Sequence, residues 1–468
     1  MSKASDPPPP PRPSRPPTSR FGRLARLGAL APRALPLALE GAKRALGTKR
    51  TEEEKLLARE KMLADAKKTA EAMLKTLGEM KGLPLKLGQM ASYIDGLAPP
   101  GYEEKFQDVL KKLQDKAPPL SADAARKVVR EELGAAPEEI FASWEAEPFA
   151  AASIGQVHRA TTRAGERVAV KVQYPGIDNA LENDLKSLSI LESFASPLAR
   201  RYQTKETLEE IKAVFLAELD YTREAQNADL FRRIFADTEE IVVPRVHHSL
   251  TTKRVLTIEY IGGRSYQEIC ESGSQEERNA AGVTIWRFMF RSLLLHGLLY
   301  ADPHPGNYRF LDGGKVAFLD YGCVKQLPEE LLDGIKRYMR AALDADWDEF
   351  DKACVEVLGF DRNDKASWDL YRSYTLELLL PLTLRGPFQC SPEGARETVA
   401  YLVRGHRKLA SQAESRLALP NLPKPPPDLT FMNRLQWGLA SVLGGLRTEA
   451  RFRELTEPWV RAPYQPLD

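Results

Sequence analysis

Two aspartates and an asparagine in one short stretch of the chain could hold a metal ion and phosphate groups. Asp302 lies in the segment Tyr-Ala-Asp-Pro-His-Pro-Gly-Asn, whose last residue is Asn307. Asp320 follows thirteen residues later, behind the apolar run Val-Ala-Phe-Leu and before Tyr-Gly. Divalent cations that bridge phosphates take such oxygen ligands, held on turns beside short strands. We therefore expect Asn307 and Asp320 to bind metal and Asp302 to accept a proton or orient a nucleophile.

The same residues have a purely structural explanation. His-Pro-Gly-Asn at 304–307 is a favourable turn sequence, and Asp-Tyr-Gly is found at the ends of many strands. Each piece alone therefore predicts a turn. Their order and spacing together favour a metal and phosphate site. The rest of the sequence has to distinguish this site from a simple turn.

A lysine late in an apolar strand is the second group that could meet phosphates. Residues 149–160 predict a strand, a turn of small residues and a second strand, and residues 167–172 predict a third strand that contains Lys171. The pattern Val-Ala-Val-Lys matches a strand whose lysine meets the α- and β-phosphates of a nucleotide. The alternative is a lysine that points to solvent from a sheet edge.

The loop before this strand contains alanine where a phosphate-binding loop has glycine. Ala150 and Ala152 occupy the first two glycine positions of a Gly-x-Gly-x-x-Gly pattern that ends at Gly155. Ala151 lies between them, and Ser153 follows Ala152. Small side chains still let backbone amides approach phosphate. Alanine restricts φ and adds a methyl group, so we expect a stiffer loop and an altered nucleotide position.

An acidic helix is expected to supply the partner of Lys171. Residues 207–231 predict one long helix that contains Glu218, Asp220 and Glu224. On a single helix Glu218 and Glu224 would face different directions, whereas Asp220 and Glu224 would share a face. One of these acids should pair with Lys171. A solvated acidic face is the alternative.

The first 135 residues predict a tail and a helical extension. Residues 1–50 contain eight prolines between 7 and 17 and then a basic stretch with one acid, which indicates a disordered tail. An anionic-lipid-binding segment and an organelle transit peptide are the alternatives. A capping box at Thr51 opens helices over 51–135, which include Lys86, Gly88 and Gln89. Lys86 and Gln89 share a polar helix face.

Composition limits the class of protein. The 468 residues exceed one typical core, and 43% hydrophobic with 28% charged residues is a globular composition. A formal net charge of +2 does not suggest nucleic-acid binding. Four scattered cysteines indicate a reducing compartment without a disulfide framework. No apolar run reaches the ~20 residues of a membrane span, and 435–446 is too short.

The remaining elements suggest two lobes joined by a hinge. Strands are expected at 242–246 and 254–260, followed by the hinge sequence Ile-Gly-Gly at 261–263. A helix capped by Ser274 should run to His296 and end at Gly297, and the chain is helical after Pro328. We therefore expect a tail at 1–50, a helical extension at 51–135, an N-lobe at 136–262 and a C-lobe at 263–468.

This order of motifs resembles the UbiB/AarF atypical kinase-like family, also called the ADCK type, which is associated with coenzyme Q biosynthesis. The resemblance covers residues 75–330. It implies an α+β, two-lobed protein-kinase-like fold with an N-terminal helical extension. It also implies ATP and Mg²⁺ as cofactors.

The resemblance assigns roles to individual residues. Asp302 would be the catalytic aspartate, and Asn307 and Asp320 would be the Mg²⁺ ligands. Lys171 would bind phosphates and pair with Glu224. The nucleotide loop would be Ala150, Ala151, Ala152 and Ser153, and the adenine-contacting hinge Glu259, Tyr260, Ile261 and Gly262. Lys86, Gly88 and Gln89 would lie over the cleft, with Lys86 meeting Glu218 and Asp220.

Differences from ordinary protein kinases help to choose between three possible functions: an ordinary kinase, a nucleotide-binding scaffold without catalysis, and an atypical kinase or ATPase. No Arg precedes Asp302, His304 replaces a common lysine, and no Ala-Pro-Glu segment follows Asp320. The missing segment and the alanine loop argue against an ordinary protein or small-molecule kinase. The retained Lys171 and Asp302 argue against a non-catalytic nucleotide-binding scaffold. An atypical kinase or ATPase that supports membrane lipid or quinone (ubiquinone) metabolism is favoured.

This hypothesis carries expectations about partners and location. ATP is the expected nucleotide, with a lipid or quinone-like ligand and a peripheral membrane surface as further partners. Many bacterial members of the family are expected to end in membrane-spanning helices, for which this chain has no candidate segment. The expected location is cytoplasmic or peripheral to a membrane, and mitochondrial if the tail is a transit peptide.

Overall fold

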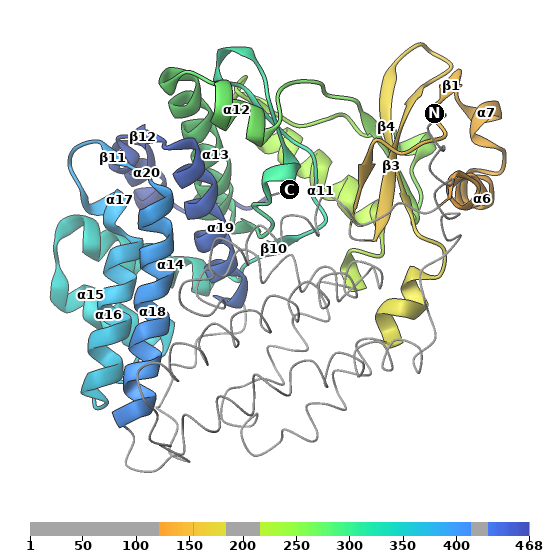
Figure 1. Cartoon of the computed structure of the whole chain (residues 1–468). Coiled ribbons are helices and arrows are strands. Elements are labelled where there is room, and N and C mark those ends of the chain that lie inside the picture. The colour runs from red at the N-terminus through yellow and green to blue at the C-terminus, as the bar shows by residue number, and fades with distance from the viewer. Residues whose placement is uncertain (1–120, 153, 184–215, 413–428, 468) are drawn as a thin grey trace, which may run out of the picture. The chain divides into compact units, whose positions relative to one another are not determined.

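The computed structural model describes residues 121–152, 154–183, 216–412 and 429–467 (Figure 1). The contacts define two compact units. Among the described residues, unit 1 comprises 121–183 and 249–257, and unit 2 comprises 216–248 and 258–467. The protein combines a small sheet in unit 1 with mostly helices in unit 2, which is the α+β class that the sequence predicted.

An antiparallel sheet forms the centre of unit 1. Its strand order is β1 (Ser143–Trp144), β3 (Gly155–Thr161), β4 (Arg167–Gln173) and β6 (Val255–Glu259), and β2 (Ala150–Ala151) also pairs with β3. Gly165, at φ 84°, closes the turn between β3 and β4. These strands confirm the predicted strand–turn–strand pattern. β4 is an interior strand, so Lys171 does not lie on a sheet edge.

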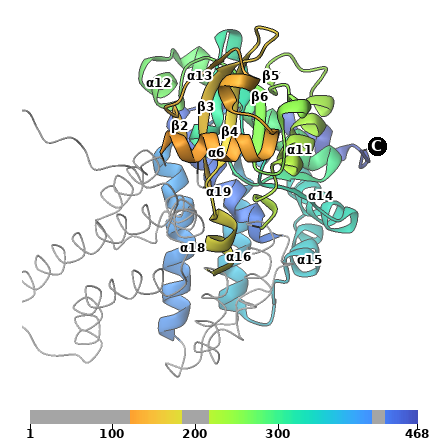
Figure 2. The ribbon, with the colours of Figure 1, turned by 90° about the vertical axis from the view of Figure 1, so that its right-hand side faces the viewer.

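One face of this sheet is covered by a helix. The helix α6 (Ala122–Leu133) lies across the strands, and the short α7 (Pro137–Ile140) follows (Figure 2). The α6 helix ends at Gly134, whose φ of 83° is the left-handed conformation that glycine favours. The buried cluster between them consists of Ala125, Val128, Val129, Phe141, Ala160, Val168, Val170, Val172 and Val255. Because side chains alternate along a strand, Lys171 points to the opposite face.

The acidic helix of unit 2 differs from the prediction. A single long helix was expected over 207–231, but among the described residues the chain leaves the helix after Ala217 and α11 runs from Tyr221 to Ile234. Asp220 is the N-cap of α11, and its carboxylate accepts a hydrogen bond from the Thr222 backbone N–H at 3.0 Å. Aspartate favours this position, since it satisfies a backbone donor that the first helical turn leaves free.

A long buried helix leads to the central strands of unit 2. The helix α12 (Tyr266–Ser272) precedes α13 (Gln275–His296), which has the predicted capping box at Ser274 and ends at Gly297 with a φ of 66°. The 3-10 helix η2 (His248–Leu250) precedes β6. Two small sheets follow: β7 (Leu298–Tyr300) with β10 (Val324–Gln326), and β8 (Tyr308–Phe310) with β9 (Val316–Phe318) and β5 (Ile241–Val242).

The remainder of unit 2 is helical, as predicted for the residues after Pro328. Its elements are α14 (Glu329–Asp344), α15 (Trp347–Leu358), α16 (Lys365–Leu378), α17 (Leu380–Thr383), β11 (Phe388–Gln389), α18 (Pro392–Gln412), α19 (Thr430–Leu446), β12 (Glu449–Ala450) and α20 (Phe452–Arg461). Within the described ranges, none of the helices combines the length and apolarity that spanning a bilayer requires. All four cysteines are free thiols.

Candidate active site

The hairpin of β8 and β9 brings Asn307 and Asp320 to the same end of two strands. Tyr308 lies opposite Phe318 in this antiparallel pair. The Leu319 backbone N–H donates to the Asn307 carbonyl oxygen at 2.9 Å, which extends the pairing by one residue. Asp320 therefore follows directly after the residue that is bonded to Asn307. The thirteen-residue separation in sequence is the length of one tight hairpin.

The strand β7 places Asp302 close to Asn307 and Asp320. The Ala301 backbone N–H donates to the carbonyl oxygen of Cys323 at 2.9 Å, so Asp302 leaves β7 beside the segment that follows Asp320. The Asn307 amide donates to the backbone oxygen of Asp302 at 3.1 Å. Asp302, Asn307 and Asp320 are all half-buried. Secondary structure and one side-chain bond thus bring together the three residues that the sequence selected.

A buried tyrosine fixes the backbone at Asp320. The hydroxyl of Tyr300 donates to the Asp320 carbonyl oxygen at 2.6 Å. Burial raises the pKa of Tyr300 well above its ordinary value, so the hydroxyl keeps its proton and remains a donor. The Asp320 carboxylate also accepts from the Gly322 backbone N–H at 2.9 Å. Asp320 is therefore restrained through both its backbone and its side chain.

His304 shapes the loop that follows Asp302. It is the N-cap of the 3-10 helix η3 (Pro305–Asn307), and its Nδ1 accepts a hydrogen bond from the Gly306 backbone N–H at 2.8 Å. An accepting Nδ1 carries no proton, so this nitrogen cannot donate to a phosphate. His304 therefore stabilises the turn where a lysine would offer a charge.

Asn307 and Asp320 fit the requirements of a Mg²⁺ site. The Asn307 amide nitrogen is used by Asp302, and within the described residues its Oδ1 accepts no hydrogen bond. An amide oxygen and a carboxylate are oxygen ligands of the kind that Mg²⁺ takes beside substrate phosphates. No group of three or more His, Cys, Asp or Glu residues in the described segments could hold a metal by itself. A site of this type needs only one or two carboxylates, because phosphates and water complete it.

The helix α11 is bonded to the segment after Asp320. Asn227 donates to the carbonyl oxygen of Tyr321 at 2.9 Å, and the Tyr321 backbone N–H donates to the Glu224 carboxylate at 3.4 Å. Both peptide groups of Tyr321 are thus paired with one face of α11. These two hydrogen bonds fix the Asp-Tyr-Gly segment against α11.

Three acidic side chains converge on Gly322. A Cβ atom at this glycine would lie 3.2 Å from Oδ1 of Asp320, 3.7 Å from Cγ of Glu218 and 3.7 Å from Oε2 of Glu224. Glu218 and Glu224 are 7% and 4% exposed. The expectation that these two glutamates face different directions was wrong, because the chain turns at Asp220 and the helix is interrupted between them. Asp220 is the N-cap of α11, four residues before Glu224.

The nucleotide-loop residues and Lys171 lie in unit 1. Ala150 and Ala151 form β2 and pair with Val157 and Gln156 of β3. The Ala152 backbone N–H donates to the Gly155 carbonyl oxygen at 2.8 Å, which closes a tight turn. Lys171 is half-buried on β4, opposite Val157. Because Glu224 belongs to unit 2, the pairing of Lys171 with Glu224 stays a prediction.

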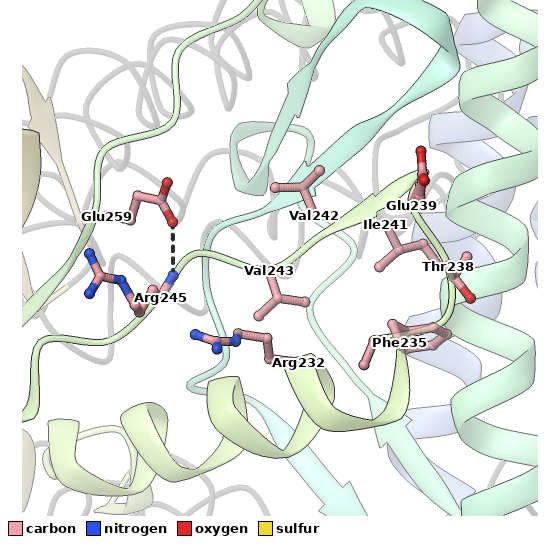
Figure 3. Close-up of a pocket in the computed structure, with 10 residues that line it drawn as sticks. Arg232, Phe235, Thr238, Glu239, Ile241, Val242, Val243, Arg245 and Glu259 are labelled. Carbon is pink, nitrogen blue, oxygen red and sulfur yellow. Dashed lines mark hydrogen bonds between the residues drawn. The ribbon is translucent and has the colours of Figure 1, made fainter.

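The hinge residues have structural contacts of their own. The Glu259 carboxylate accepts from the Arg245 backbone N–H at 3.3 Å, and both residues line an open pocket together with Arg232 at the end of α11 (Figure 3). The segment after Gly262 is anchored to β8 by reciprocal backbone bonds of 2.9 Å between Arg264 and Phe310. The Glu259 side chain is thus used locally, whereas Tyr260, Ile261 and Gly262 connect β6 to this anchor.

Four predicted site residues lie outside the described part of the chain. They are Lys86, Gly88, Gln89 and Ser153. Their assigned roles, over the cleft and in the nucleotide loop, remain predictions.

Sequence reasoning missed the residues that position the site. Asn227 and Tyr300 touch no expected ligand, but each holds a backbone oxygen of the Asp320–Tyr321 segment. The spacing of Glu224 and Asn227, three residues apart on one helix face, was the available signal for the first. A tyrosine at the end of an apolar strand gave no comparable signal, because such residues are commonly part of the core.

The comparisons with known proteins agree with this geometry. Residues 112–354 match the family model described as the ABC1 atypical kinase-like domain, which is just over half of the chain. The chain belongs to this family. The match includes Lys171, Glu224, Asp302, Asn307 and Asp320, and its start at residue 112 precedes the first described helix.

Individual relatives support the same conclusion. The chain is 32% identical over 365 residues to the mitochondrial atypical kinase COQ8B of Rattus norvegicus, covering 73% of this chain and 67% of the relative. It is 33% identical over 283 residues to the chloroplastic protein ACTIVITY OF BC1 COMPLEX KINASE 8 of Arabidopsis thaliana, covering 58% of this chain. The match spans 36% of that longer relative.

A solved structure shares the fold. Rv3197 of Mycobacterium tuberculosis, determined in complex with erythromycin, superposes with a TM-score of 0.59 at 26% sequence identity. The superposition covers 89% of this chain and 100% of that chain.

Proposed function

We propose that this protein binds Mg-ATP and catalyses ATP hydrolysis or phosphoryl transfer. The observation that carries the proposal is the convergence of Asp302, Asn307 and Asp320, joined by the Leu319–Asn307 and Asn307–Asp302 hydrogen bonds. These are the residue types that accept a proton or orient a nucleophile and hold metal in phosphoryl transfer. Membership of an atypical kinase-like family supports the same chemistry.

The roles follow from the positions within unit 2. Asn307 Oδ1 and the Asp320 carboxylate would hold Mg²⁺, which when bound would neutralise part of the phosphate charge. Asp302 would accept the proton of the attacking group or orient it. Tyr300 and Asn227 would keep the Asp320 backbone in place while the nucleotide exchanges.

Two buried acids, one just before α11 and one on it, support the predicted partnerships. Glu218 and Glu224 are almost fully buried, and buried carboxylates need cations or hydrogen-bond donors. We infer that Glu224 pairs with Lys171, which would then meet the phosphates, and that Glu218 and Asp220 meet Lys86. The hinge at Glu259, Tyr260, Ile261 and Gly262 would contact adenine. The loop of Ala150, Ala151, Ala152 and Ser153 would cover the phosphates.

The acceptor is proposed to be connected with membrane lipid or quinone metabolism. The resemblance to the coenzyme Q-associated family supports this, and two relatives are named as mitochondrial and chloroplastic. Peripheral membrane contact through the basic residues of 1–50, or organelle import through the same segment, belongs to the same proposal.

Hydrolysis of Mg-ATP by the purified chain, with and without anionic liposomes, tests the proposal. The Asp320→Asn variant removes the proposed metal ligand and is the reference for background. A turnover that lipid raises and that the variant lacks supports the membrane-linked enzyme. Tight ATP binding without turnover in either condition would instead favour the nucleotide-binding scaffold.

A further inference from the structure

The helical part of unit 2 contains a partly open, mainly apolar cavity of about 190 Å³. Its walls come from helices far apart in the sequence, among them α13 with Trp286, α14 with Tyr338, and α19 with Trp437. The chain between α16 and α18, including α17 and β11, closes a further side. The cavity shares no residue with the group around Asp302, Asn307 and Asp320.

The lining is almost free of charge. Among the described residues that line the cavity, Glu377 is the one charged side chain, and it is exposed. Cys390 is buried, and burial raises the pKa of its thiol to about 12, so it stays neutral. Leu293, Ile335 and Leu443 add fully buried aliphatic groups. A phosphate or carboxylate would meet no cation among these described lining residues and would face the Glu377 carboxylate.

Three polar side chains of the lining are bonded to other parts of the protein. Trp286 Nε1 donates to Thr456 at 2.8 Å, and Trp437 Nε1 donates to the Tyr374 hydroxyl at 2.6 Å. The Thr398 hydroxyl donates to the Gly394 carbonyl oxygen at 3.0 Å. These three side chains therefore present mainly carbon surface to the cavity, whose lining as a whole is mostly apolar.

We propose that this cavity binds a small uncharged apolar molecule, such as a single aromatic ring with a short alkyl chain. An engineered cavity of about 150 Å³ lined by Leu, Ile and Phe binds benzene. The cavity of about 190 Å³ in this protein, whose lining is mostly but not wholly apolar, has room for a ring and a few further carbons.

The helix α19 connects this site to the loop that carries Asp302. Met432, Gln436 and Trp437 of α19 line the cavity. Gly438 of the same helix lies so close to the loop that a Cβ atom there would be 2.4 Å from Cγ of Pro303. A ligand in the cavity would thus rest on the helix that supports the residue after Asp302.

The test uses the full chain and three probes of similar shape: butylbenzene, 4-phenylbutyrate and 4-phenylbutylamine. Calorimetry and thermal unfolding are expected to detect butylbenzene binding and a melting temperature that rises with its concentration. The two charged probes are expected to bind at least tenfold more weakly. Equal binding of a charged probe, or no binding of butylbenzene, would overturn the proposal.

Variants locate the binding. Ala395→Phe, on α18, fills the cavity and should weaken butylbenzene binding at least tenfold, and Ala440→Phe, on α19, does the same should the first variant not fold. Ala400→Phe is the matched control, because Ala400 lies on α18 but does not line the cavity. Unchanged binding in the filled variants, or an equal loss in the control, would place the ligand elsewhere. This test depends on binding and stands apart from ATP turnover.

Discussion

The side-chain amide of Asn227 donates a hydrogen bond to the backbone carbonyl oxygen of Tyr321 at 2.9 Å. This bond joins α11 to the residue that follows Asp320. Because Glu224 accepts from the Tyr321 N–H, one helix face holds both peptide groups of that residue. The position of Asp320 is therefore linked to the position of α11.

Removing the Asn227 amide should loosen this link. Asn227→Ala leaves the Tyr321 carbonyl oxygen without its donor, which should lower the free energy of unfolding by about 1–2 kcal/mol. We expect the kcat of Mg-ATP turnover to fall about tenfold as Asp320 gains freedom. Gln226→Ala, at an exposed position on the same helix, is the control and should change neither quantity. A parent-like kcat in Asn227→Ala would show that α11 does not position Asp320.

Crowding α19 against the catalytic loop should slow turnover. An alanine at 438 would place its Cβ 2.4 Å from Pro303, so the loop or the helix must move. Alanine in a helix is otherwise favourable by about 1 kcal/mol over glycine. We expect Gly438→Ala to lower kcat about tenfold without raising the melting temperature. Gly386→Ala, where the added atom meets open space, should match the parent. A more stable and fully active Gly438→Ala would refute the contact.

The turn at Ala152 should set nucleotide affinity. Its N–H is bonded to Gly155, and alanine allows fewer backbone conformations than glycine. Ala152→Gly is therefore expected to shift the ATP and ADP dissociation constants by at least severalfold, measured by calorimetry. Ala164→Gly, in the β3–β4 turn on the same sheet, serves as the comparison. Unchanged constants for both nucleotides in Ala152→Gly would remove the loop from the nucleotide site.

A buried histidine should make unit 1 sensitive to acid. Burial lowers the pKa of His158 below 6.5, and its Nδ1 and Nε2 are 2.9 Å and 3.0 Å from the Glu145 carbonyl oxygen and the Gln156 amide nitrogen. The folded state then binds fewer protons than the unfolded state. Its stabilisation is present above pH 6.5 and is lost as the pH falls below that value.

The melting temperature of the full chain measured against pH tests this histidine. It should decrease below pH 6.5, and His158→Phe, which keeps a ring against Trp144, should flatten the decrease while lowering stability at neutral pH. His296, whose pKa burial also lowers, should account for part of the remaining slope, and His296→Phe measures that part. An identical slope in His158→Phe and the parent would contradict the assignment.

Local patterns predicted the elements that carry the site. The capping box at Ser274, the glycine end of α13 at Gly297 and the strand around Lys171 all follow from short-range rules, and the structure has them. The spacing of Asp302, Asn307 and Asp320 was enough to predict their convergence, since a strand and a hairpin fix it within twenty residues.

Contacts between distant segments could not be predicted in the same way. The helical periodicity of residues 207–231 favoured one long helix. The chain instead breaks before Asp220, because the Asp220 side chain caps a new helix there. The Tyr300–Asp320 and Asn227–Tyr321 bonds join residues through tertiary packing. The apolar cavity is formed by helices from residue 286 to residue 443, whose individual patterns say only that each has a buried face.

Calorimetric titration of ATP into the full chain, with Mg²⁺ and then with excess chelator, measures whether Asp320 holds the metal that nucleotide binding needs. We expect binding that needs Mg²⁺ in the parent and is lost in Asp320→Asn. Asp312→Asn, in the turn between β8 and β9, should bind as the parent does. Mg²⁺-dependent ATP binding of parent affinity in Asp320→Asn would contradict the assignment of this residue and the phosphoryl-transfer site built around it.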